Sequence, residues 1–345
     1  MIGDRNYLSL QSPLRVGLIG TGYAAKARAD AFRCDPRSQL VAITGHTPER
    51  TDEFAQIYQT ESYDHWMDLF TQVELDLVVI ANVNQLHGTI AKAALSAGKH
   101  VVVEYPLALN WSEARDIVAL AHTNRLLLHV EHIELLGGLH QSLLQNLPSV
   151  GSVCYIRYAT LTPQRPAPRK WNYNQELFGF PYIAALSRIH RLTHTFGEVT
   201  EVNCTSHFWG PMGQPLQDSY YGTCLCSLQL QFASGIKADV LYGKGECLWQ
   251  GDRRMEIHGT QGALIFNGDE GLLLNHGGQQ PLRIEGRRGI FAKDTAMVLD
   301  YLYDGTPLYV QPQSSLYALQ VAEAAHQSAL TGQRVRVESI ANHSP

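Results

Sequence analysis

The sequence has little of two features that would each point to a class of function. Its 345 residues include only six cysteines and no CxxC pair, which argues against a disulfide framework and a zinc site. We interpret them as buried apolar residues of a reducing compartment: Cys34, Cys154, Cys204, Cys224, Cys226 and Cys247. A basic excess is also missing. The net charge of −5 argues against binding to nucleic acid or an acidic membrane.

Long apolar runs are missing as well. No stretch approaches the roughly 18 apolar residues of a membrane span, and the first 13 residues lack the apolar core of a secretory signal. We therefore expect a soluble, cytoplasmic protein. Apolar residues make up 45% of the chain and charged residues 17%, which is enough to bury a sizeable core. The length suits two domains of about 100–200 residues each.

Residues 14–130 alternate between apolar runs and segments of helical composition. The expected strands are 14–20, 39–45, 75–82, 100–103 and 125–130. Helices are expected between them: one begins at Pro48 after Thr47, one ends near Gly98, and one is capped by Ser112. This alternation predicts an N-terminal Rossmann domain over residues 1–130, with a doubly wound parallel sheet.

The pattern changes after about residue 150. Strand-like segments follow at 152–161, 199–209, 223–232, 236–243, 255–260, 263–268 and 281–286. Helices are expected at 181–196, 292–303 and 314–331. We predict a substrate-binding domain over residues 131–345, built on a large, mostly antiparallel sheet. The fold class is therefore α/β followed by α+β, and the last helix is a candidate to pack back on the Rossmann domain.

The segment GTGYAA, residues 20–25, follows the first strand and opens the first helix, a context typical of a dinucleotide-binding loop. Gly20 permits a tight turn, Gly22 lets the backbone approach a pyrophosphate, and the small Ala25 lets helix pack on strand. The other loop residues expected at the cofactor are Thr21, Tyr23 and Ala24. The helix N-terminus would then hold the pyrophosphate. The alternative is a glycine-rich turn without a ligand.

The residues after the second strand indicate which dinucleotide binds. An NAD-binding domain usually places Asp or Glu there to hold the ribose 2′-hydroxyl. Here the strand end has no acid, and the segment contains His46, Thr47 and Arg50. Because arginine suits a 2′-phosphate, we predict NADPH as the cofactor, with NADH used more weakly. In the alternative interpretation, Thr47 is only a helix cap and Arg50 is solvated.

Polar residues also follow the third expected strand, at the edge of the sheet where such folds bind ligands. Asn82, Asn84 and His87 lie there, placed to contact the ribose or the nicotinamide. They are equally suited to forming the loop and capping the next helix. Both interpretations stay open at this point.

The strand at 100–103 ends on Glu104, Tyr105 and Pro106, so an acid and a phenol face the ligand edge. A Rossmann half followed by a large-sheet half resembles the glucose–fructose oxidoreductase and inositol dehydrogenase family over essentially the whole chain. In that family the strand typically ends in Glu-Lys-Pro, and the lysine serves the substrate hydroxyl. Tyr105 stands in the place of that lysine. We predict catalytic roles for Tyr105 and Glu104, and a cofactor contact for Glu104.

A second motif of that family lies in the helix before the large sheet and usually supplies Asp and His for the same alcohol chemistry. Counted back from Gly197, the Asp position is here His190 and the His position is Ser187. The sugar-oxidising residues are therefore largely replaced. A polyol is the weaker expectation for the substrate.

Three segments carry a more specific resemblance: VEYPLAL (103–109), HVEHIELLGGLH (129–140) and the stretch from FGFP to LSRIHRLTHTFG (178–197). They resemble the biliverdin reductases of this family, in their cyanobacterial form more than their animal form. The resemblance implies NADPH-dependent reduction of biliverdin IXα to bilirubin, with a hydride added at the central C10 methine bridge. The alternatives are an NADP-dependent sugar or cyclitol dehydrogenase and a non-catalytic, NADP-sensing regulator.

The expected helix 181–196 has side chains that suit this reaction. Hydride addition places electron density on a pyrrole nitrogen, which must gain a proton, and the substrate carries two propionates. Arg188 and Arg191 share a helix face, and His194 lies a further turn along. Arginine is too basic to be an ordinary general acid, so Arg188 is expected to polarise the tetrapyrrole or orient a water. Arg191 and His194 are expected to bind a propionate.

Glu131 and Glu134 are three residues apart, and we expect them on one helix face, where they could act together as catalytic residues in proton supply. In the alternative interpretation they form ion pairs with the two arginines of helix 181–196. With His129 and His132 they resemble a metal cluster only superficially. No metal is expected, because the spacing matches no metal motif and hydride transfer from NADPH needs none.

Aromatic residues are frequent around helix 181–196. Phe180 and Trp171 are candidates for stacking on the flat tetrapyrrole, although most aromatic side chains of this region should form ordinary core. The candidates for a second propionate contact lie near turns of the large sheet: Lys244, Arg253, Arg254, Arg287 and Arg288. The expected partner is biliverdin, with no nucleic acid and no membrane. The sequence does not indicate an oligomeric state.

Overall fold

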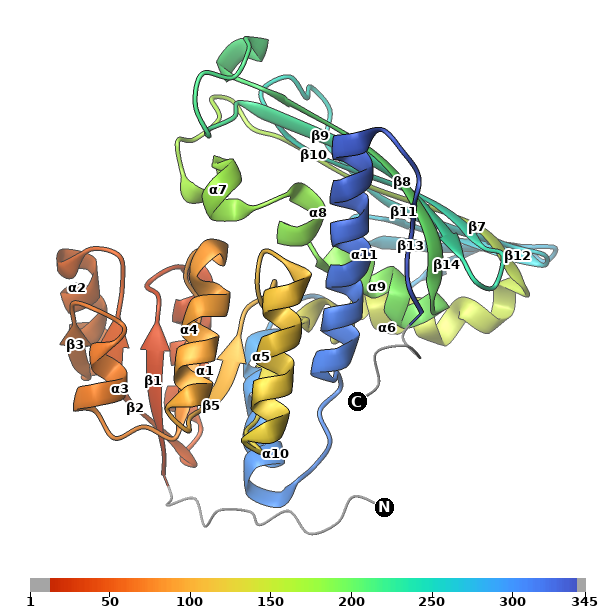
Figure 1. Cartoon of the computed structure of the whole chain (residues 1–345). Helices are drawn as coiled ribbons and strands as arrows, with labels where there is room; N and C mark the ends of the chain where they lie inside the picture. Colours follow the sequence, from red (N-terminus) through yellow and green to blue (C-terminus); the bar gives the residue numbers. More distant parts are fainter. Residues whose placement is uncertain (1–12, 340–345) are drawn as a thin grey trace. The chain divides into compact units, whose positions relative to one another are not determined.

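The structure is a computed structural model that describes residues 13–339, and it divides into two compact units (Figure 1). The first comprises the chain up to Ala108, Ser112–Ile133 and Gly289–Ser315. The second comprises Leu109–Trp111, Glu134–Arg288 and the chain from Leu316 onward. The domain boundary at residue 130 and the return of helix 314–331 to the Rossmann domain stay predictions.

Among residues 13–339, the first unit contains one six-stranded parallel sheet in the order β3-β2-β1-β4-β5-β6. Its strands are β1 Leu14–Ile19, β2 Ser38–Thr44, β3 Glu61–Tyr63, β4 Leu77–Ile80, β5 His100–Val103 and β6 Leu128–Val130. This is the strand order of a doubly wound dinucleotide-binding sheet, so the predicted α/β class is confirmed. Strand β3 has no signal in the sequence, because this three-residue edge strand has no buried residue.

The helices of the first unit follow the predicted alternation. They are α1 Tyr23–Cys34, α2 Pro48–Tyr58, α3 Asp68–Gln72, α4 Asn84–Ser96, α5 Trp111–Thr123 and α10 Ile290–Asp304. Helix α2 begins at Pro48 as predicted, whereas α5 begins one residue before the expected cap at Ser112. Helix α10 packs on α1, and its Val298 and Leu299 join the core of the parallel sheet. A helix that comes after most of the large sheet in the chain therefore completes the first unit.

The second unit is built on a large mixed sheet, nine-stranded within the described chain, in the order β14-β13-β12-β11-β7-β10-β9-β8-β15. The strands are β7 Val153–Pro163, β8 Val199–Trp209, β9 Thr223–Phe232, β10 Lys237–Gly245, β11 Asp252–Gly259, β12 Gly262–Asn267, β13 Glu270–Asn275, β14 Gly278–Leu282 and β15 Val335–Arg336. Only β7 and β10 pair in parallel among these strands, so the predicted mostly antiparallel sheet is confirmed. The expected strand at 281–286 was wrong beyond Leu282, where β14 ends.

Helices cover one face of this sheet, where α8, α9 and α11 lie (Figure 1). The helical segments are η1 Ile133–Leu135, α6 Gly138–Asn146, η2 Leu147–Val150, η3 Trp171–Tyr173, α7 Gln175–Phe178, α8 Pro181–Ala184, α9 Ser187–Phe196, η4 Pro211–Gly213 and α11 Pro312–Thr331. The expectation of one helix over 181–196 was wrong. Ala185 has φ −101° and ψ 41°, outside the helical region, so α8 ends after one turn. The Tyr182 hydroxyl lies 2.5 Å from the Val240 carbonyl oxygen and fixes α8 on the sheet separately from α9.

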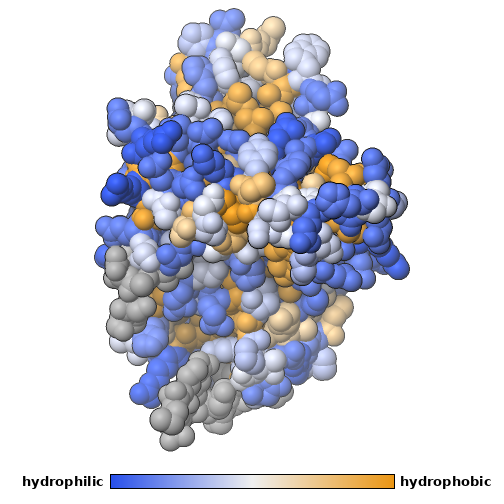
Figure 2. Space-filling view, turned by 90° about the vertical axis from the view of Figure 1, so that its right-hand side faces the viewer, coloured by the Kyte–Doolittle hydropathy of each residue, from blue (hydrophilic) through white to orange (hydrophobic). Residues whose placement is uncertain are grey.

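The opposite face of the large sheet is polar. Tyr155 donates a hydrogen bond to Asp239 at 3.0 Å, and Arg157 lies 3.7 Å from Glu256. Because side chains alternate along a strand, residues of one strand divide strictly between the two faces. Figure 2 shows one side of the molecule, on which hydrophilic side chains are interspersed with apolar ones.

The six cysteines do not share one environment. The three on β8 and β9 are buried, whereas Cys34, Cys154 and Cys247 are exposed. The expectation that all six are buried was therefore wrong for three of them, which lie at a helix end, near the start of β7 or in a loop. Within residues 13–339, no helix has both the length and the apolarity to cross a membrane.

Candidate active site

The loop between β1 and α1 has the geometry that a bound pyrophosphate requires. Gly20 has φ +130°, and a Cβ at this position would lie 2.2 Å from the Ala81 carbonyl oxygen, so only glycine fits. A Cβ at Gly22 would meet no described atom within 4 Å. Gly22 caps α1 without a side-chain hydrogen bond, and Ala25 is fully buried. The helix N-terminus is therefore open to an anion.

The end of β2 carries no acid, as the sequence indicates. A Cβ at Gly45 would lie 2.6 Å from the Thr51 hydroxyl, so the end of β2 packs closely against α2 there. Thr47 is the N-cap of α2, but its side chain makes no capping hydrogen bond. Arg50 is exposed and makes no ion pair with the part of the chain that the structure describes. These residues fit a 2′-phosphate, and the roles of His46, Thr47 and Arg50 stay predictions.

The loop after β4 contains an unsatisfied acceptor. Asn82 Oδ1 is buried and accepts no hydrogen bond from residues 13–339, so a ligand donor would suit it. His87 is held between two carbonyl oxygens, that of Pro106 at 2.8 Å from Nδ1 and that of Asn82 at 3.3 Å from Nε2. Burial lowers the pKa of His87, and a neutral ring donates only one hydrogen bond, so the shorter contact, with Pro106, ties the start of α4 to the loop after β5. The cofactor contacts of Asn82, Asn84 and His87 stay predictions.

Strand β5 ends where the sequence predicts and brings Glu104 and Tyr105 to the carboxyl edge of the sheet, both partly exposed. Glu104 Oε1 accepts a hydrogen bond from Arg28 Nε at 3.0 Å. The Tyr105 ring lies parallel to the His132 ring within 2°, with centroids 5.5 Å apart. His132 is fixed in turn, because its Nε2 lies 2.9 Å from Ser315 Oγ. The phenol of Tyr105 therefore has a defined position at the ligand edge.

Arg28 of α1 is the centre of a buried charge network that the sequence analysis missed. Its side chain is fully buried between Glu104 and Asp294, and it donates to Thr295 Oγ1 at 3.2 Å. Burial by itself lowers the pKa of Arg28 and raises that of Asp294. Their attraction outweighs this, so the pKa of Arg28 is raised and that of Asp294 is lowered, and both are charged. The network joins α1, the end of β5 and α10.

Asp294 also binds residues of two further segments. It accepts a hydrogen bond from the Tyr309 hydroxyl at 2.7 Å and lies 2.8 Å from Nε2 of His129, at the end of β6. The only local signal for this network was an arginine on the apolar face of α1, between Ala25 and Ala29. Its partner in α10 is more than 260 positions away in the chain, and no local pattern reveals such a pairing.

Glu131 and Glu134 do not share a helix face, so this expectation was wrong. Strand β6 ends at Val130, and only the three-residue η1 follows. Glu131 is 1% exposed, and its Oε1 accepts a hydrogen bond from the Ile133 N–H at 2.5 Å. Glu134 Oε1 lies 3.7 Å from Arg287 Nη2. Glu131 belongs to the first unit and Glu134 to the second. The roles of both carboxylates in proton supply stay predictions.

The two arginines of α9 differ in exposure. Arg188 is partly exposed, donates a hydrogen bond to Ser187 Oγ at 3.0 Å, and lies over the Tyr242 ring with Cζ 5.4 Å from the centroid. Arg191 is 6% exposed and donates to the Tyr158 hydroxyl at 2.8 Å and to the Glu134 backbone carbonyl at 3.4 Å. Arg188 is therefore the more accessible of the two. The propionate contact of Arg191 stays a prediction.

Three histidines gather beside Arg191. The His194 ring lies 5.6 Å from that of His140 and 5.9 Å from that of His190. Burial, with the neighbouring charges, lowers the pKa of His140 and of His190 to about 3, so both rings are neutral at neutral pH. Burial also lowers the pKa of His194, an exposed residue whose propionate contact stays a prediction. Within residues 13–339, no three His, Cys, Asp or Glu side chains are arranged to hold a metal.

The predicted stacking residues lie in different surroundings. Phe180 is 8% exposed and stacks on His326 at 4.4 Å, which makes it a core residue. Trp171 is 38% exposed and lies 5.8 Å from the ring of Phe178. Of these two, only Trp171 presents a free ring surface. Their contact with a tetrapyrrole stays a prediction.

Lys244 of β10 occupies a cage of aromatic rings. It is 7% exposed, and its Nζ lies 3.9 Å from the Phe178 centroid and 4.6 Å from that of Tyr173. Nζ also donates to the backbone carbonyl of Asn172. Burial lowers the pKa of Lys244 to about 8. The structure thus encloses one of the five cations considered for the second propionate.

Both units match the sequence patterns of a single family. Residues 14–132 match an oxidoreductase family described by its NAD-binding Rossmann fold, and residues 148–337 match the C-terminal alpha/beta domain of the same family. The chain belongs to this oxidoreductase family, which includes the glucose–fructose oxidoreductases and inositol dehydrogenases that the sequence resembles.

Within this family, the chain is similar to several characterised proteins. The chain is similar to a biliverdin reductase from Synechocystis sp. PCC 6803, solved in complex with biliverdin and NADP⁺: 49% identity, a TM-score of 0.89, and coverage of 92% of this chain and 99% of that one. Biliverdin reductase A of Mus musculus is 26% identical over 72% of this chain and 77% of its own length. Levoglucosan dehydrogenase of Pseudarthrobacter phenanthrenivorans is 25% identical over 74% of this chain and 73% of its own.

Proposed function

We propose that this chain is an NADPH-dependent biliverdin reductase. The reaction adds a hydride to the central C10 methine carbon of biliverdin and a proton to a pyrrole nitrogen, giving bilirubin and NADP⁺. One observation carries the proposal: the 49% identity, over 92% of this chain, with an enzyme solved in complex with biliverdin and NADP⁺. The 26% identity with mouse biliverdin reductase A points in the same direction.

The first unit is proposed to hold NADPH, which supplies the hydride when bound. The glycine loop offers an uncapped helix N-terminus for the pyrophosphate. The exposed Arg50 offers a charge for the 2′-phosphate, and the unsatisfied Asn82 Oδ1 offers an acceptor. Glu104 is partly exposed at the carboxyl edge of the sheet, and Arg28 fixes its orientation.

The substitution of Tyr105 for the family's lysine supports a bilin over a polyol. A dehydrogenase must remove a proton from a substrate hydroxyl, and a lysine amine suits that step. The reduction of a methine bridge removes no proton from a hydroxyl. A phenol fixed by stacking on His132 is suited to donating a hydrogen bond to the substrate instead.

Arg188 is proposed to stabilise the charge that develops on the substrate during hydride addition. Its guanidinium keeps its proton at any ordinary pH, so its role is to polarise the tetrapyrrole or to orient the water that delivers the proton. The partial exposure of Arg188 and its position over Tyr242 support this role.

A steady-state assay tests the proposal. The purified chain is incubated with NADPH and biliverdin IXα, and bilirubin formation is followed by absorbance. Glucose and inositol are tested with NADP⁺ in parallel. We expect turnover with biliverdin and none with the polyols. Comparable turnover with a polyol would favour a sugar dehydrogenase, and NADPH binding without any turnover would favour a regulator; either result would overturn the proposal.

A further inference from the structure

The five cations near the turns of the large sheet are not equivalent once their surroundings are known. Arg254 contacts Glu256, Arg287 lies 3.7 Å from Glu134, and Lys244 is enclosed by aromatic rings. Arg288 follows β14 outside any strand or helix, so no strand register places it on a face of the sheet. These four cations are paired, enclosed or outside the strands. Arg253 is the remaining candidate.

Arg253 projects from the helix-covered face of the sheet. In the strand register, Arg253 of β11 lies opposite Thr160 of β7, and Thr160 also lies opposite Tyr242 of β10. Residues that lie directly opposite each other on neighbouring strands share a face. Arg253 therefore shares a face with Tyr242, the ring over which Arg188 lies. The row spans three adjacent strands, so the Cα atoms of Arg253 and Tyr242 are about 10 Å apart.

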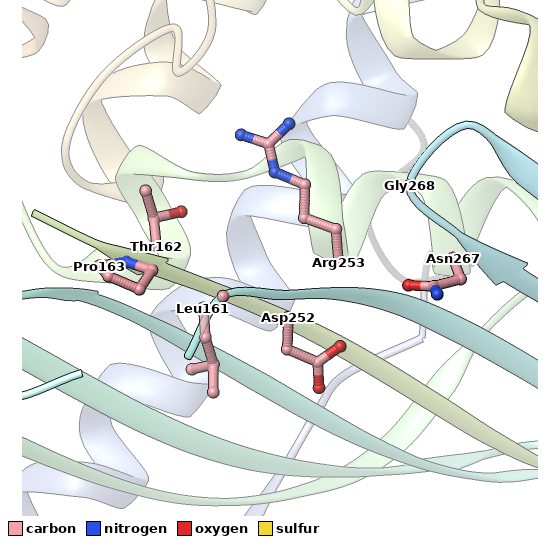
Figure 3. Close-up of a pocket in the computed structure, with 8 residues that line it drawn as sticks. Leu161, Thr162, Pro163, Asp252, Arg253, Asn267 and Gly268 are labelled. Carbon is pink, nitrogen blue, oxygen red and sulfur yellow. The ribbon is translucent and has the colours of Figure 1, made fainter. Parts of the chain in front are cut away.

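The neighbour of Arg253 in the chain provides a contrast. Asp252 points to the opposite face, where it lies 3.9 Å from Arg157. Figure 3 shows this alternation directly: Arg253 and Thr162 extend to one side of the strands, and Asp252 and Leu161 to the other. The adjacent carboxylate of Asp252 is therefore directed away from the Arg253 guanidinium.

Arg253 lines an open cavity without an acidic partner of its own. The cavity has a volume of about 350 Å³. Thr162, Arg253 and Asn267 line it, and so does Asp252, whose carboxylate extends to the other side of the strands (Figure 3). Arg253 is exposed and makes no ion pair with residues 13–339. A guanidinium and a hydroxyl on the same side of a cavity are suited to a carboxylate, which arginine binds through two parallel hydrogen bonds.

We infer that Arg253 is a substrate-binding residue that holds one propionate carboxylate of the bilin; this inference rests on the proposed function. The two propionates of biliverdin stand on the two rings that flank its central methine bridge. A cation that binds one propionate should therefore lie on the same sheet face as the group that acts at the methine bridge. It should also lie some distance away from that group. Arg253 has this relation to Arg188.

Kinetics of two neighbouring variants test the inference. Arg253→Ala should raise KM for biliverdin about tenfold or more, the usual scale for losing a charge-assisted hydrogen bond, with kcat and the Kd of NADPH nearly unchanged. Arg254→Ala is the matched control, because it removes the same charge one residue away on the opposite sheet face. It should leave KM unchanged. Arg253→Lys should restore binding only in part, since an ammonium lacks the two-pronged geometry.

A second measurement identifies which group of the substrate Arg253 binds. The dimethyl ester of biliverdin lacks both carboxylates, so it should bind the wild-type chain more weakly than biliverdin does. Arg253→Ala should reduce this difference, whereas Arg254→Ala should retain it in full. An equal ester penalty in all three proteins, or a wild-type KM in Arg253→Ala, would overturn the inference while leaving the proposed function intact. A wild-type chain that does not reduce biliverdin would overturn both.

Discussion

The first unit surrounds its most buried cation with carboxylates, whereas the second unit surrounds one of its buried cations with aromatic rings. Arg28 has no exposed side-chain surface and contacts both Glu104 and Asp294. Lys244 is 7% exposed, and within residues 13–339 no carboxylate lies within ion-pair distance of it. Its neighbours are the rings of three residues: Tyr173, Phe178 and Tyr221.

This comparison distinguishes cations that stabilise the fold from cations that are available to a ligand. The carboxylates around Arg28 neutralise it, so its function is to join α1, the end of β5 and α10. Desolvation makes a buried charge costly unless an opposite charge accompanies it. In the second unit, the faces of aromatic rings offset part of the desolvation cost of Lys244. Arg253 is exposed and has no ion-pair partner among the described residues. The proposed binding of a dianionic substrate by the second unit requires unpaired cations such as Arg253.

Removal of Arg28 should have the largest effect on stability. Arg28→Met keeps the bulk but leaves Glu104 and Asp294 without their cation, and breaking a buried pair typically costs about 3–5 kcal/mol of unfolding free energy. Denaturant unfolding measures this loss. Arg33→Met on the same helix is the control, because the pair of Arg33 with Asp30 is exposed and should be worth less than about 1 kcal/mol. Equal losses in the two variants would contradict the structural role of Arg28.

Arg188 should affect turnover instead of stability. Arg188→Ala should lower kcat about 100-fold, the usual scale for losing one preorganised donor at the reacting centre. The affinity for NADPH should not change. Steady-state kinetics with biliverdin, together with a fluorescence titration of NADPH, measure both quantities. A variant with wild-type kcat but lower stability would place Arg188 with Arg28 among the structural cations.

Arg50 provides a contrast to Arg28 within the first unit, because Arg50 is exposed and has no ion pair among the described residues. If charge without an acidic partner is available to a ligand, Arg50→Ala should weaken NADPH binding about tenfold or more. NADH lacks the 2′-phosphate and should bind as before. The two dissociation constants can be compared directly by titration. Equal weakening of both nucleotides would show that Arg50 does not recognise the phosphate.

Lys244 should give the smallest change at neutral pH. Lys244→Met removes a desolvated charge that no carboxylate neutralises, so the unfolding free energy at pH 7 should change by less than about 1 kcal/mol, or increase. An unfolding experiment at pH 7 measures this. A loss as large as that of Arg28→Met would show that the aromatic cage binds the ammonium as tightly as carboxylates do.

The pH dependence of stability provides a further readout for Lys244. Burial lowers its pKa from 10.5 to about 8, so between these values the unfolded chain holds a proton that the folded chain has released. The unfolding free energy contributed by Lys244 therefore rises with pH across this window and is lowest below pH 8. Lys244→Met should abolish that rise. Unfolding curves of both proteins at pH 7 and pH 10 would detect it.

Local sequence signals were reliable where short-range physics decides the structure. Pro48 fixed the start of α2, the run of valines fixed β5, and alternation fixed β8 and β9 to the residue. The signals failed where long-range contacts decide. Helix 181–196 breaks at Ala185 because the Tyr182 hydroxyl is anchored to strand carbonyls, which its sequence does not reveal.

The sequence by itself determined the succession of a parallel sheet, a mostly antiparallel sheet and the cofactor loop's glycines, because periodicity, glycine geometry and strand endings act over a few residues. It also supplied Tyr105 in place of the family's lysine. Only the tertiary structure decided which charges are available to a ligand. Arg28 and Asp294 meet across more than 260 positions of the chain, and strand register sends Arg253 and Arg254 to opposite faces of one sheet. The ion-pair partner of a charged side chain and the sheet face on which it lies both depend on distant segments. Composition and spacing therefore could not predict either of them.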